Sequence, residues 1–175
     1  MDLEEFKQQV QLPLPVCTLV LLTKGDEVLL AMKKRGFGAG WWNGVGGKLD
    51  PGETVIEAAV RKTREEIDVV IDPDDLTLVA KINFYFPHDP KDKQNNQQVQ
   101  VFLCEHWQGE PKESEEMAPK WFPKLKPPLE AMWPGDDLWM PRVLLGETGT
   151  AEIMFNPFDN PNLVTDYRID LAPAG

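Results

Sequence analysis

The chain has 175 residues, 42% of them hydrophobic, and a formal net charge of −11. This length and apolar content suit a single domain over residues 1–175 with a core of its own. The negative charge argues against binding a nucleic acid polymer through a general basic surface, because its phosphates would be repelled. An anionic ligand would need a metal ion or a local basic cluster to offset this repulsion.

The N-terminus and the cysteines bear on the compartment. Residues 1–13 form a polar, acidic arm that could hold a short helix but lacks the basic start and apolar run of a signal peptide. No apolar stretch is long enough to span a bilayer. Cys17 and Cys104 lie in apolar, strand-like runs and are too few for a disulfide scaffold, so we expect reduced core residues. These features predict a cytoplasmic protein without a membrane partner, and we expect a monomer.

The first two expected strands form a hairpin. Residues 16–22 are almost continuously apolar, which predicts a buried central strand. The sequence Lys24, Gly25, Asp26 favours a hairpin turn, and residues 28–32 are the expected partner strand.

A basic, glycine-rich stretch follows the hairpin. Residues 33–48 read KKRGFGAGWWNGVGGK. Glycines let a backbone approach a ligand closely. Lys33, Lys34 and Arg35 could then meet phosphates, or they could form a solvated basic turn. The stretch lacks the Gly-Lys-Ser/Thr ending of a P-loop, which excludes that motif.

Residues 46–69 organise the rest of the chain. A glycine turn and a Pro-Gly turn precede a helix that we expect to begin at Glu53. At 3.6 residues per turn, an apolar stripe lies beside a face that carries Glu65 and Glu66. Two adjacent carboxylates that face a glycine turn with free carbonyls are hard oxygen ligands, which suits Mg²⁺ or Mn²⁺. The predicted buried stripe consists of Ile56, Ala59, Val60, Thr63 and Ile67.

Two further strands are expected after the helix. Residues 76–86 form a strand with Phe84 and Phe86 on one face. Residues 87–98 are a polar surface loop, and residues 99–107 are the return strand.

The last third of the chain alternates helix and strand signals. A short helix is expected to end at Trp133, before a Pro-Gly break. Asp136 or Asp137 could then cap a second helix, as aspartate at an N-cap does. Residues 151–155 and 162–169 are the terminal strand candidates, and there is no internal repeat.

The stretch GGKLDPGETVIEAAVRKTREEIDV resembles the Nudix box, which has a glycine, a glutamate six residues on, then an Arg-Glu and a Glu-Glu pair. The matching residues are Gly47, Glu53, Arg61, Glu65 and Glu66. Two positions depart from the pattern, because Lys62 replaces the first glutamate after the arginine and Asp68 replaces a glycine. The alternative is a solvated charged helix face, but the long, irregular spacing argues against a chance match. We expect Glu53 and Arg61 to form an orienting ion pair.

Outside the box, the segments KKRGFGAGWWNG, ESEEM, AMWP and TDY resemble the oxidised purine nucleoside triphosphatase (8-oxo-dGTP diphosphatase) group of Nudix hydrolases. The resemblance covers most of the chain from Thr18 to Tyr167. It implies an α/β fold, the Nudix α/β/α sandwich with a mixed sheet between helices. It also implies Mg²⁺-dependent hydrolysis, with Mn²⁺ as an alternative cofactor, of oxidised purine nucleoside triphosphates to monophosphate and pyrophosphate. Such an enzyme removes damaged nucleotides from the pool before they enter DNA.

The resemblance also implies the residues of the site. The implied metal ligands are the Gly46 carbonyl, Glu65, Glu66 and Glu116, and Glu65 and Glu66 are also the implied catalytic residues. The implied nucleotide pocket contains Thr18, Lys33, Phe37, Asn43, Phe84 and Trp133. The side-chain chemistry agrees, since an amide offers a donor and an acceptor to a base edge and aromatic rings offer stacking faces. The alternative for the two phenylalanines is plain core packing.

One departure concerns the loop that would read the base. The family has two aspartates directly after its Trp-Pro pair, whereas here Gly135 comes first and Asp136 and Asp137 follow. Without a gap only Asp136 matches the pair, and with a shift of one residue both match. Asp136 and Asp137 are therefore the candidates for base recognition.

Because Lys62 replaces a glutamate of the Nudix box, the sequence allows alternative functions. It lies four residues before Glu66, so its ammonium could pair with that carboxylate and compete with a cation. We therefore expect weaker metal binding than is usual in the family, and a gain from Lys62→Glu. The alternatives are a Nudix hydrolase of another nucleoside diphosphate-linked substrate, such as a nucleotide sugar or a capped nucleotide, and a nucleotide-binding module with weakened catalysis.

Overall fold

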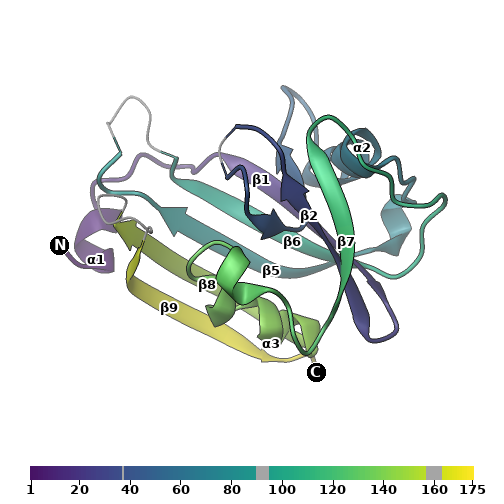
Figure 1. Cartoon of the computed structure of the whole chain (residues 1–175). Coiled ribbons are helices and arrows are strands. Elements are labelled where there is room, and N and C mark those ends of the chain that lie inside the picture. The colour runs from purple at the N-terminus through teal and green to yellow at the C-terminus, as the bar shows by residue number, and fades with distance from the viewer. Residues whose placement is uncertain (37, 90–94, 157–162) are drawn as a thin grey trace.

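The computed structural model describes residues 1–36, 38–89, 95–156 and 163–175. These residues form a mixed sheet of nine strands (Figure 1). The strand order is β3-β2-β1-β6-β5-β8-β9, with β4 paired to β1 and β7 paired to β2. The strands are β1 (Val16–Lys24), β2 (Glu27–Lys33), β3 (Trp42–Asn43), β4 (Val45–Lys48), β5 (Leu76–Tyr85), β6 (Gln97–Cys104), β7 (Met117–Pro123), β8 (Glu147–Asn156) and β9 (Leu163–Pro173).

The sheet is mixed, and the helices that accompany it are short except for α2. The β1–β6 and β5–β8 pairs are parallel and the other paired strands are antiparallel, which makes the sheet mixed. The helical segments are α1 (Leu3–Lys7), α2 (Val55–Ile67), α3 (Met140–Leu144) and three 3-10 turns, η1 (Pro73–Asp75), η2 (Leu129–Ala131) and η3 (Asp136–Leu138). Among the described residues, no helix combines the length and the apolar content needed to cross a bilayer.

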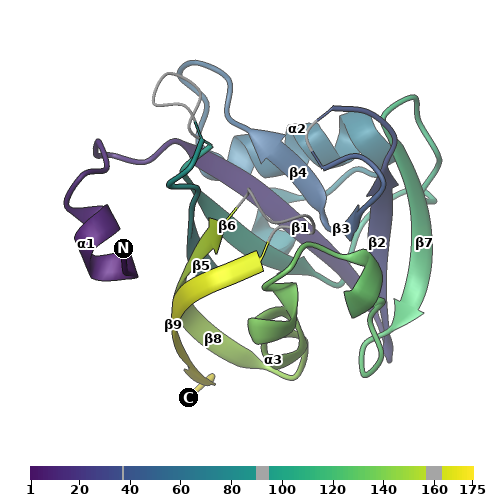
Figure 2. The same cartoon turned by 60° about the vertical axis from the view of Figure 1, so that its left-hand side comes forward.

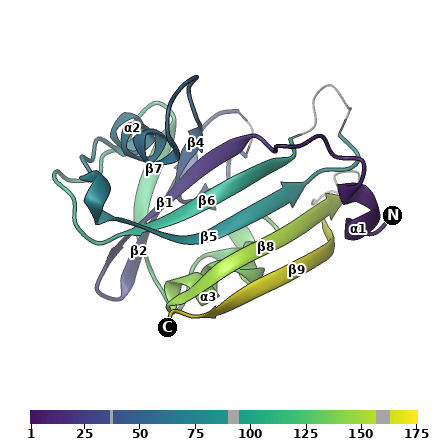
Figure 3. The same ribbon diagram turned by 180° about the vertical axis from the view of Figure 1, so that it is seen from behind.

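Strand β1 shows how the two faces of the sheet are covered. Successive side chains of a strand point to opposite faces. Leu19 and Leu21 belong to a core cluster that includes residues of α3, whereas Val20 belongs to a second cluster that includes residues of α2. The two helices thus pack on opposite faces, as Figure 2 shows, and Figure 3 shows α3 on the far side of β8 in the view from behind. The predicted α/β class with a mixed sheet between helices is confirmed.

The long helix begins two residues later than predicted. Its first residue is Val55, and Thr54 is its N-cap. Thr54 Oγ1 accepts a hydrogen bond from the Glu57 N–H at 3.1 Å, and Glu57 returns a bond to the Thr54 N–H at 3.2 Å. This capping box satisfies the free N–H groups of the first turn. Glu53 is consequently left outside the helix.

The buried stripe of α2 is also rotated from the predicted one. Ile56 is 40% exposed, so its predicted burial is wrong, and Val60 is only half-buried. The charged residue Glu66 instead lies inside, with 3% of its surface exposed. Sequence periodicity missed this because it assigns charged residues to the outer face. The buried residues of the helix are Ala58, Ala59, Thr63, Glu66 and Ile67.

Asp68, one of the two departures from the Nudix box, lies at the end of α2. Asp68 is the C-cap and has a left-handed backbone with φ +58°. This conformation favours glycine, because it brings Cβ close to the neighbouring carbonyl oxygen. Asp68 also forms ion pairs with Arg64 at 3.6 Å and with Lys112 at 3.7 Å. These pairs are exposed and therefore contribute little.

We expect Asp68→Gly to raise the free energy of unfolding by up to about 1 kcal/mol, because glycine removes a left-handed Cβ strain of about 1–2 kcal/mol. The greater entropy of glycine in the unfolded chain offsets part of this gain, and the ion pairs that are lost are exposed. Urea denaturation of the variant and of wild type measures the difference. Asp68→Ala is the matched control, since it removes the same carboxylate but keeps Cβ, and it should give no gain. Equal effects of the two changes would show that the backbone at this position is not strained.

The N-terminal arm is not wholly polar, which corrects the prediction for residues 1–13. Helix α1 buries Leu3 and Phe6 in a small cluster with Tyr85 and Met154. The Phe6 and Tyr85 rings meet edge to face, with centroids 6.0 Å apart. The arm therefore packs against the ends of β5 and β8.

Two further local predictions are corrected. Strand β7 was not predicted, because prolines and lysines interrupt its apolar pattern, yet it pairs with β2 along seven positions from Glu27 to Lys33. Neither Asp136 nor Asp137 caps α3, whose N-cap is Trp139 without a side-chain bond.

The prediction that Cys17 and Cys104 are buried and form no disulfide is confirmed. Within the predicted loop 87–98 and strand 162–169, residues 90–94 and 162 lie outside the described residues.

Candidate active site

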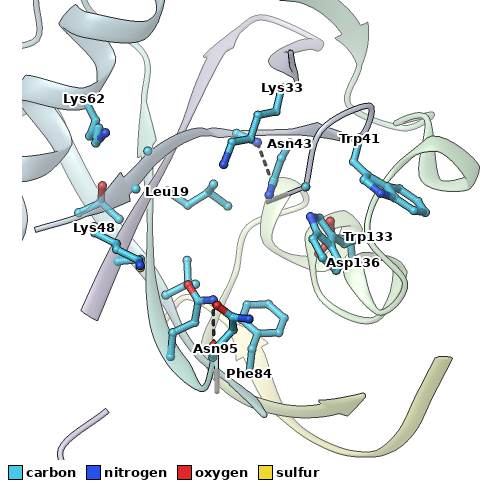
Figure 4. A pocket seen from close by; sticks show the side chains of 18 of the residues that line it. Leu19, Lys33, Trp41, Asn43, Lys48, Lys62, Phe84, Asn95, Trp133 and Asp136 are labelled. Carbon is cyan, nitrogen blue, oxygen red and sulfur yellow. Dashed lines mark hydrogen bonds between the residues drawn. The ribbon is translucent and has the colours of Figure 1, made fainter. Parts of the chain in front are cut away.

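A cavity of about 440 Å³ lies between β1, β4, the glycine-rich loop and the segment around η3. Its two sides differ in chemistry (Figure 4). Figure 4 shows Lys48 and Lys62 on one side and Trp41 and Trp133 on the other, with Lys33 and Asn43 between them. The aromatic residues that line the cavity are Trp41, Phe84, Phe86, Trp133, Trp139 and Phe155.

Most of the predicted pocket residues meet in this cavity. Those that line it are Thr18, Lys33, Asn43, Gly46, Phe84, Trp133 and Asp136. Asp137 is exposed and is not among the lining residues. Phe37 lies outside the described residues, so its predicted role remains a prediction.

Two buried polar atoms at the cavity have no partner among the described residues. They are Thr18 Oγ1 and Asp136 Oδ2. The other oxygen of Asp136 accepts a hydrogen bond from Trp139 Nε1 at 3.1 Å. Burial raises the pKa of Asp136 to about 7, the Trp139 bond lowers it, and the charge of Asp137 raises it further. Since buried polar groups are normally paired, these two atoms indicate a polar ligand.

Gly135 determines the backbone turn directly before Asp136. Gly135 has φ +96°, and a Cβ atom there would lie 3.1 Å from Val164 Cγ2 and 3.2 Å from Ile153 Cγ2. The tight space and the left-handed backbone both favour glycine. This geometry turns Asp136 inward and leaves Asp137 at the surface.

The aromatic side of the cavity is a chain of contacting rings. Trp41 stacks on Trp133 with centroids 5.9 Å apart and an interplanar angle of 21°. Trp133 in turn lies 6.3 Å from Phe155, which stacks on Phe84 at 5.9 Å. Phe84 therefore contacts the core and lines the cavity at once. Nearby, Asn43 Oδ1 accepts a hydrogen bond from the Gly44 N–H at 2.8 Å, which fixes the orientation of its amide.

Among the lining residues that the sequence did not identify are two tryptophans and a lysine. Trp41 and Trp139 were not proposed, although a second tryptophan beside Trp42 and an aromatic residue three positions after Asp136 were visible signals. Lys48 was missed because it lies within the Nudix box at a position without a pattern requirement.

Glu66 lies at the junction of α2 and β4. Its Oε2 atom accepts a hydrogen bond from the Gly46 N–H at 3.1 Å. Burial raises the pKa of Glu66 to about 7, while the Gly46 bond and the charge of Lys62 lower it and the charge of Glu116 raises it. A buried carboxylate with a second carboxylate nearby is stabilised by any cation that binds beside it.

The other two predicted acidic ligands are engaged by arginines. Glu65 accepts from Arg61 Nη1 at 3.2 and 3.3 Å, and Glu116 accepts from Arg35 Nη2 at 3.5 Å. In the described ranges, no group of three or more His, Cys, Asp or Glu is placed to hold a metal ion. The predicted set therefore fits a divalent cation in its oxygen chemistry, but the acidic side chains are not gathered around one point.

Arg61 ties the Nudix-box loop to α2. It contacts both carboxylate oxygens of Glu53 at 2.7 Å and donates to the Lys48 carbonyl at 3.2 Å. The bonds from Arg61 lower the pKa of Glu53 to about 2. The expected ion pair is present, and with the bond to the Lys48 carbonyl it fixes the segment between the end of β4 and the start of α2.

A family model for the NUDIX domain matches residues 13–143. The chain belongs to the Nudix family and is a Nudix hydrolase. Two curated relatives from Danio rerio and Mus musculus, each named oxidized purine nucleoside triphosphate hydrolase, align with most of it. The first is 39% identical over 153 residues, which covers 87% of this chain and 92% of the relative. The second is 44% identical over 127 residues, with coverages of 73% and 78%.

A solved structure supports the fold. The structure titled mMutator MutT protein from Bacillus halodurans superposes with a TM-score of 0.70 at 24% identity, covering 93% of this chain and all of the other. Nudix hydrolases generally use divalent metal ions such as Mg²⁺.

Proposed function

We propose that this chain hydrolyses purine nucleoside triphosphates, oxidised purine forms above all, to monophosphate and pyrophosphate in a Mg²⁺-dependent reaction. The observation that carries the proposal is the two-sided cavity, with aromatic faces and an unpaired aspartate oxygen opposite lysines. The names of the two curated relatives support the same substrate class. Removal of damaged nucleotides from the pool is the role that follows.

The aromatic side suits the base. Trp133 offers a ring for stacking, and Asn43 offers an amide with a fixed orientation. Asp136 places an oxygen without a partner at the same cavity. A purine that presents a complementary edge would satisfy this oxygen, whereas a base without the matching group would leave it unpaired at a cost of about 1–3 kcal/mol.

The lysine side suits the phosphates. Lys48 lines this side and Lys33 lies between the two sides, in a chain whose net charge is −11. Gly46, Glu65, Glu66 and Glu116 would hold Mg²⁺, which when bound stabilises charge on the phosphate oxygens and lowers the pKa of the attacking water. The Gly46 N–H orients the Glu66 carboxylate, and the Arg61–Glu53 pair holds the loop in register with α2.

A substrate panel tests the proposal. We expect purine triphosphates, normal and oxidised, to be hydrolysed faster than pyrimidine triphosphates, with release of pyrophosphate and with dependence on Mg²⁺. Separate detection of pyrophosphate and phosphate identifies the bond that is cleaved. Preferred turnover of a nucleotide sugar or a capped dinucleotide would contradict the substrate assignment, and metal-independent binding without turnover would contradict the assignment of an enzyme.

A further inference from the structure

The side chain of Lys62 crosses from α2 over β4 to the cavity. A Cβ atom added at Gly47 would lie 3.0 Å from Lys62 Cε and 3.4 Å from Lys62 Nζ. The lysine thus fills the space that the glycine leaves, and its end reaches the cavity that Figure 4 shows. Only 23% of the side chain is exposed, so its path is fixed by packing.

Lys62 interacts with two carboxylates, Glu65 and Glu66, but it forms no hydrogen bond to either among the described residues. Its ion pair is with Glu65 Oε2 at 3.8 Å, a distance beyond a hydrogen bond. Glu65 is already bound by Arg61 at 3.2 Å. Within the described part of the chain, Lys62 has no hydrogen-bond partner. Among the described residues Lys62 forms no ion pair with Glu66 of the kind that the sequence made possible, although its charge lowers the pKa of that carboxyl.

The ammonium acts on the cavity wall. Burial raises the pKa of the Cys17 thiol on β1, and the charges of Lys48 and Lys62 lower it. Cys17 and both lysines line the same cavity. The positive charge of Lys62 therefore lies at the wall of the space that would receive the ligand.

We propose that the Lys62 ammonium binds the phosphate chain of the nucleotide and supplies a fixed positive charge there. This inference rests on the proposed function. Lysine suits the role because its ammonium is a compact charge with three donors. The residue that breaks the Nudix-box pattern then strengthens nucleotide binding in a way that does not depend on metal.

Calorimetric titration without metal tests the proposal. An α,β-methylene purine nucleoside triphosphate, which cannot be cleaved at that bond, and the corresponding nucleoside are titrated in EDTA into wild type, Lys62→Met and Lys62→Arg. Lys62→Met should lose about tenfold or more in affinity for the triphosphate, the scale of one hydrogen bond to a charged group. Its affinity for the nucleoside should not change, and Lys62→Arg should recover part of the loss.

Lys24→Met is the matched control, because Lys24 is exposed at the β1–β2 turn and should bind both ligands like wild type. The proposal is overturned if Lys62→Met keeps the wild-type affinity for the triphosphate, or if it loses affinity for the nucleoside equally. Unchanged metal-free binding together with a lower Mg²⁺ requirement for turnover would mean that Lys62 competes with the cation instead.

The substrate panel separates the two proposals. If wild type hydrolyses purine triphosphates while Lys62→Met binds the analogue normally, only the role of Lys62 fails. If wild type neither binds nor hydrolyses any purine triphosphate, both proposals fail.

Discussion

Glu66→Gln is expected to lose about 100-fold or more of the wild-type turnover, the scale of one lost electrostatic contact to a transition state, while the protein stays folded. The amide keeps the shape of the side chain and the oxygen that accepts from the Gly46 N–H. It removes only the charge that a divalent cation needs. Steady-state kinetics over a Mg²⁺ titration measure the loss, and circular dichroism checks the fold.

Glu27→Gln is the control for this change, because Glu27 is exposed at the start of β2 and should leave turnover unaffected. A Glu66→Gln variant that hydrolyses substrate at the wild-type rate would rule Glu66 out as a metal ligand.

The same variant should alter the pH dependence of stability in EDTA. Burial raises the pKa of Glu66 from 4.5 to about 7. Between these values the folded state binds a proton that the unfolded state has released, so the free energy of unfolding falls as pH rises through this window. The Glu66→Gln variant has no carboxyl that titrates at this position, so its free energy of unfolding should not fall in this way. It should match wild type near pH 4 and exceed it at pH 8 by up to about 3 kcal/mol. Urea denaturation at both pH values tests this, and a constant difference would show that Glu66 does not titrate there.

Asp136→Ala is expected to lower kcat/KM for purine triphosphates by about tenfold to a hundredfold, the cost of one unpaired buried group, and to reduce the preference for purines. Asp137→Ala should have little effect. Asp136 is 3% exposed and has an unpartnered oxygen at the cavity, whereas Asp137 is exposed. Kinetics across the panel provide the comparison. Equal losses would mean that both aspartates read the base, and no loss in either would mean that it is read elsewhere.

Asp136→Asn separates recognition from folding. The amide oxygen can still accept from Trp139 Nε1, while the second position becomes a donor. A guanine-type edge presents N–H donors and so requires the ionised carboxylate. With the pKa of Asp136 raised to about 7, wild-type affinity for a guanine nucleoside monophosphate in EDTA should rise between pH 6 and pH 8. Asp136→Asn should bind more weakly and without this rise. A pH-independent affinity in wild type would contradict the role of the carboxylate.

The sequence predicted the elements that have a clean apolar pattern. Strand β1 and helix α2 were found within two residues of their observed limits, because β1 is an almost continuous apolar run that is buried on both faces and α2 has an apolar stripe with a period of 3.6. Strand β7 was not found, because its hydrogen bonds to β2 depend on backbone pairing that the side-chain pattern does not reveal.

The candidate site was predictable in its members but not in its arrangement. Asn43 and Trp133, which the resemblance alone assigned to a nucleotide pocket, both line the cavity. Asp136 was expected as a possible helix cap, but the buried Trp139 N–H binds its carboxylate instead. Such a contact is decided by burial, which a propensity rule for helix ends does not include. The engagement of Glu65 by Arg61 likewise depends on side-chain directions that spacing does not fix.

Gly135 limits how this enzyme can change by single substitutions. Any side chain at that position would need a left-handed backbone at φ +96° and would press on Val164 and Ile153 at 3.1 and 3.2 Å. A lineage that began from this loop could not gain a carboxylate directly after the Trp-Pro pair without first rebuilding the turn. A change of base preference that needs a carboxylate at position 135 would therefore require compensating changes at Val164 or Ile153 as well.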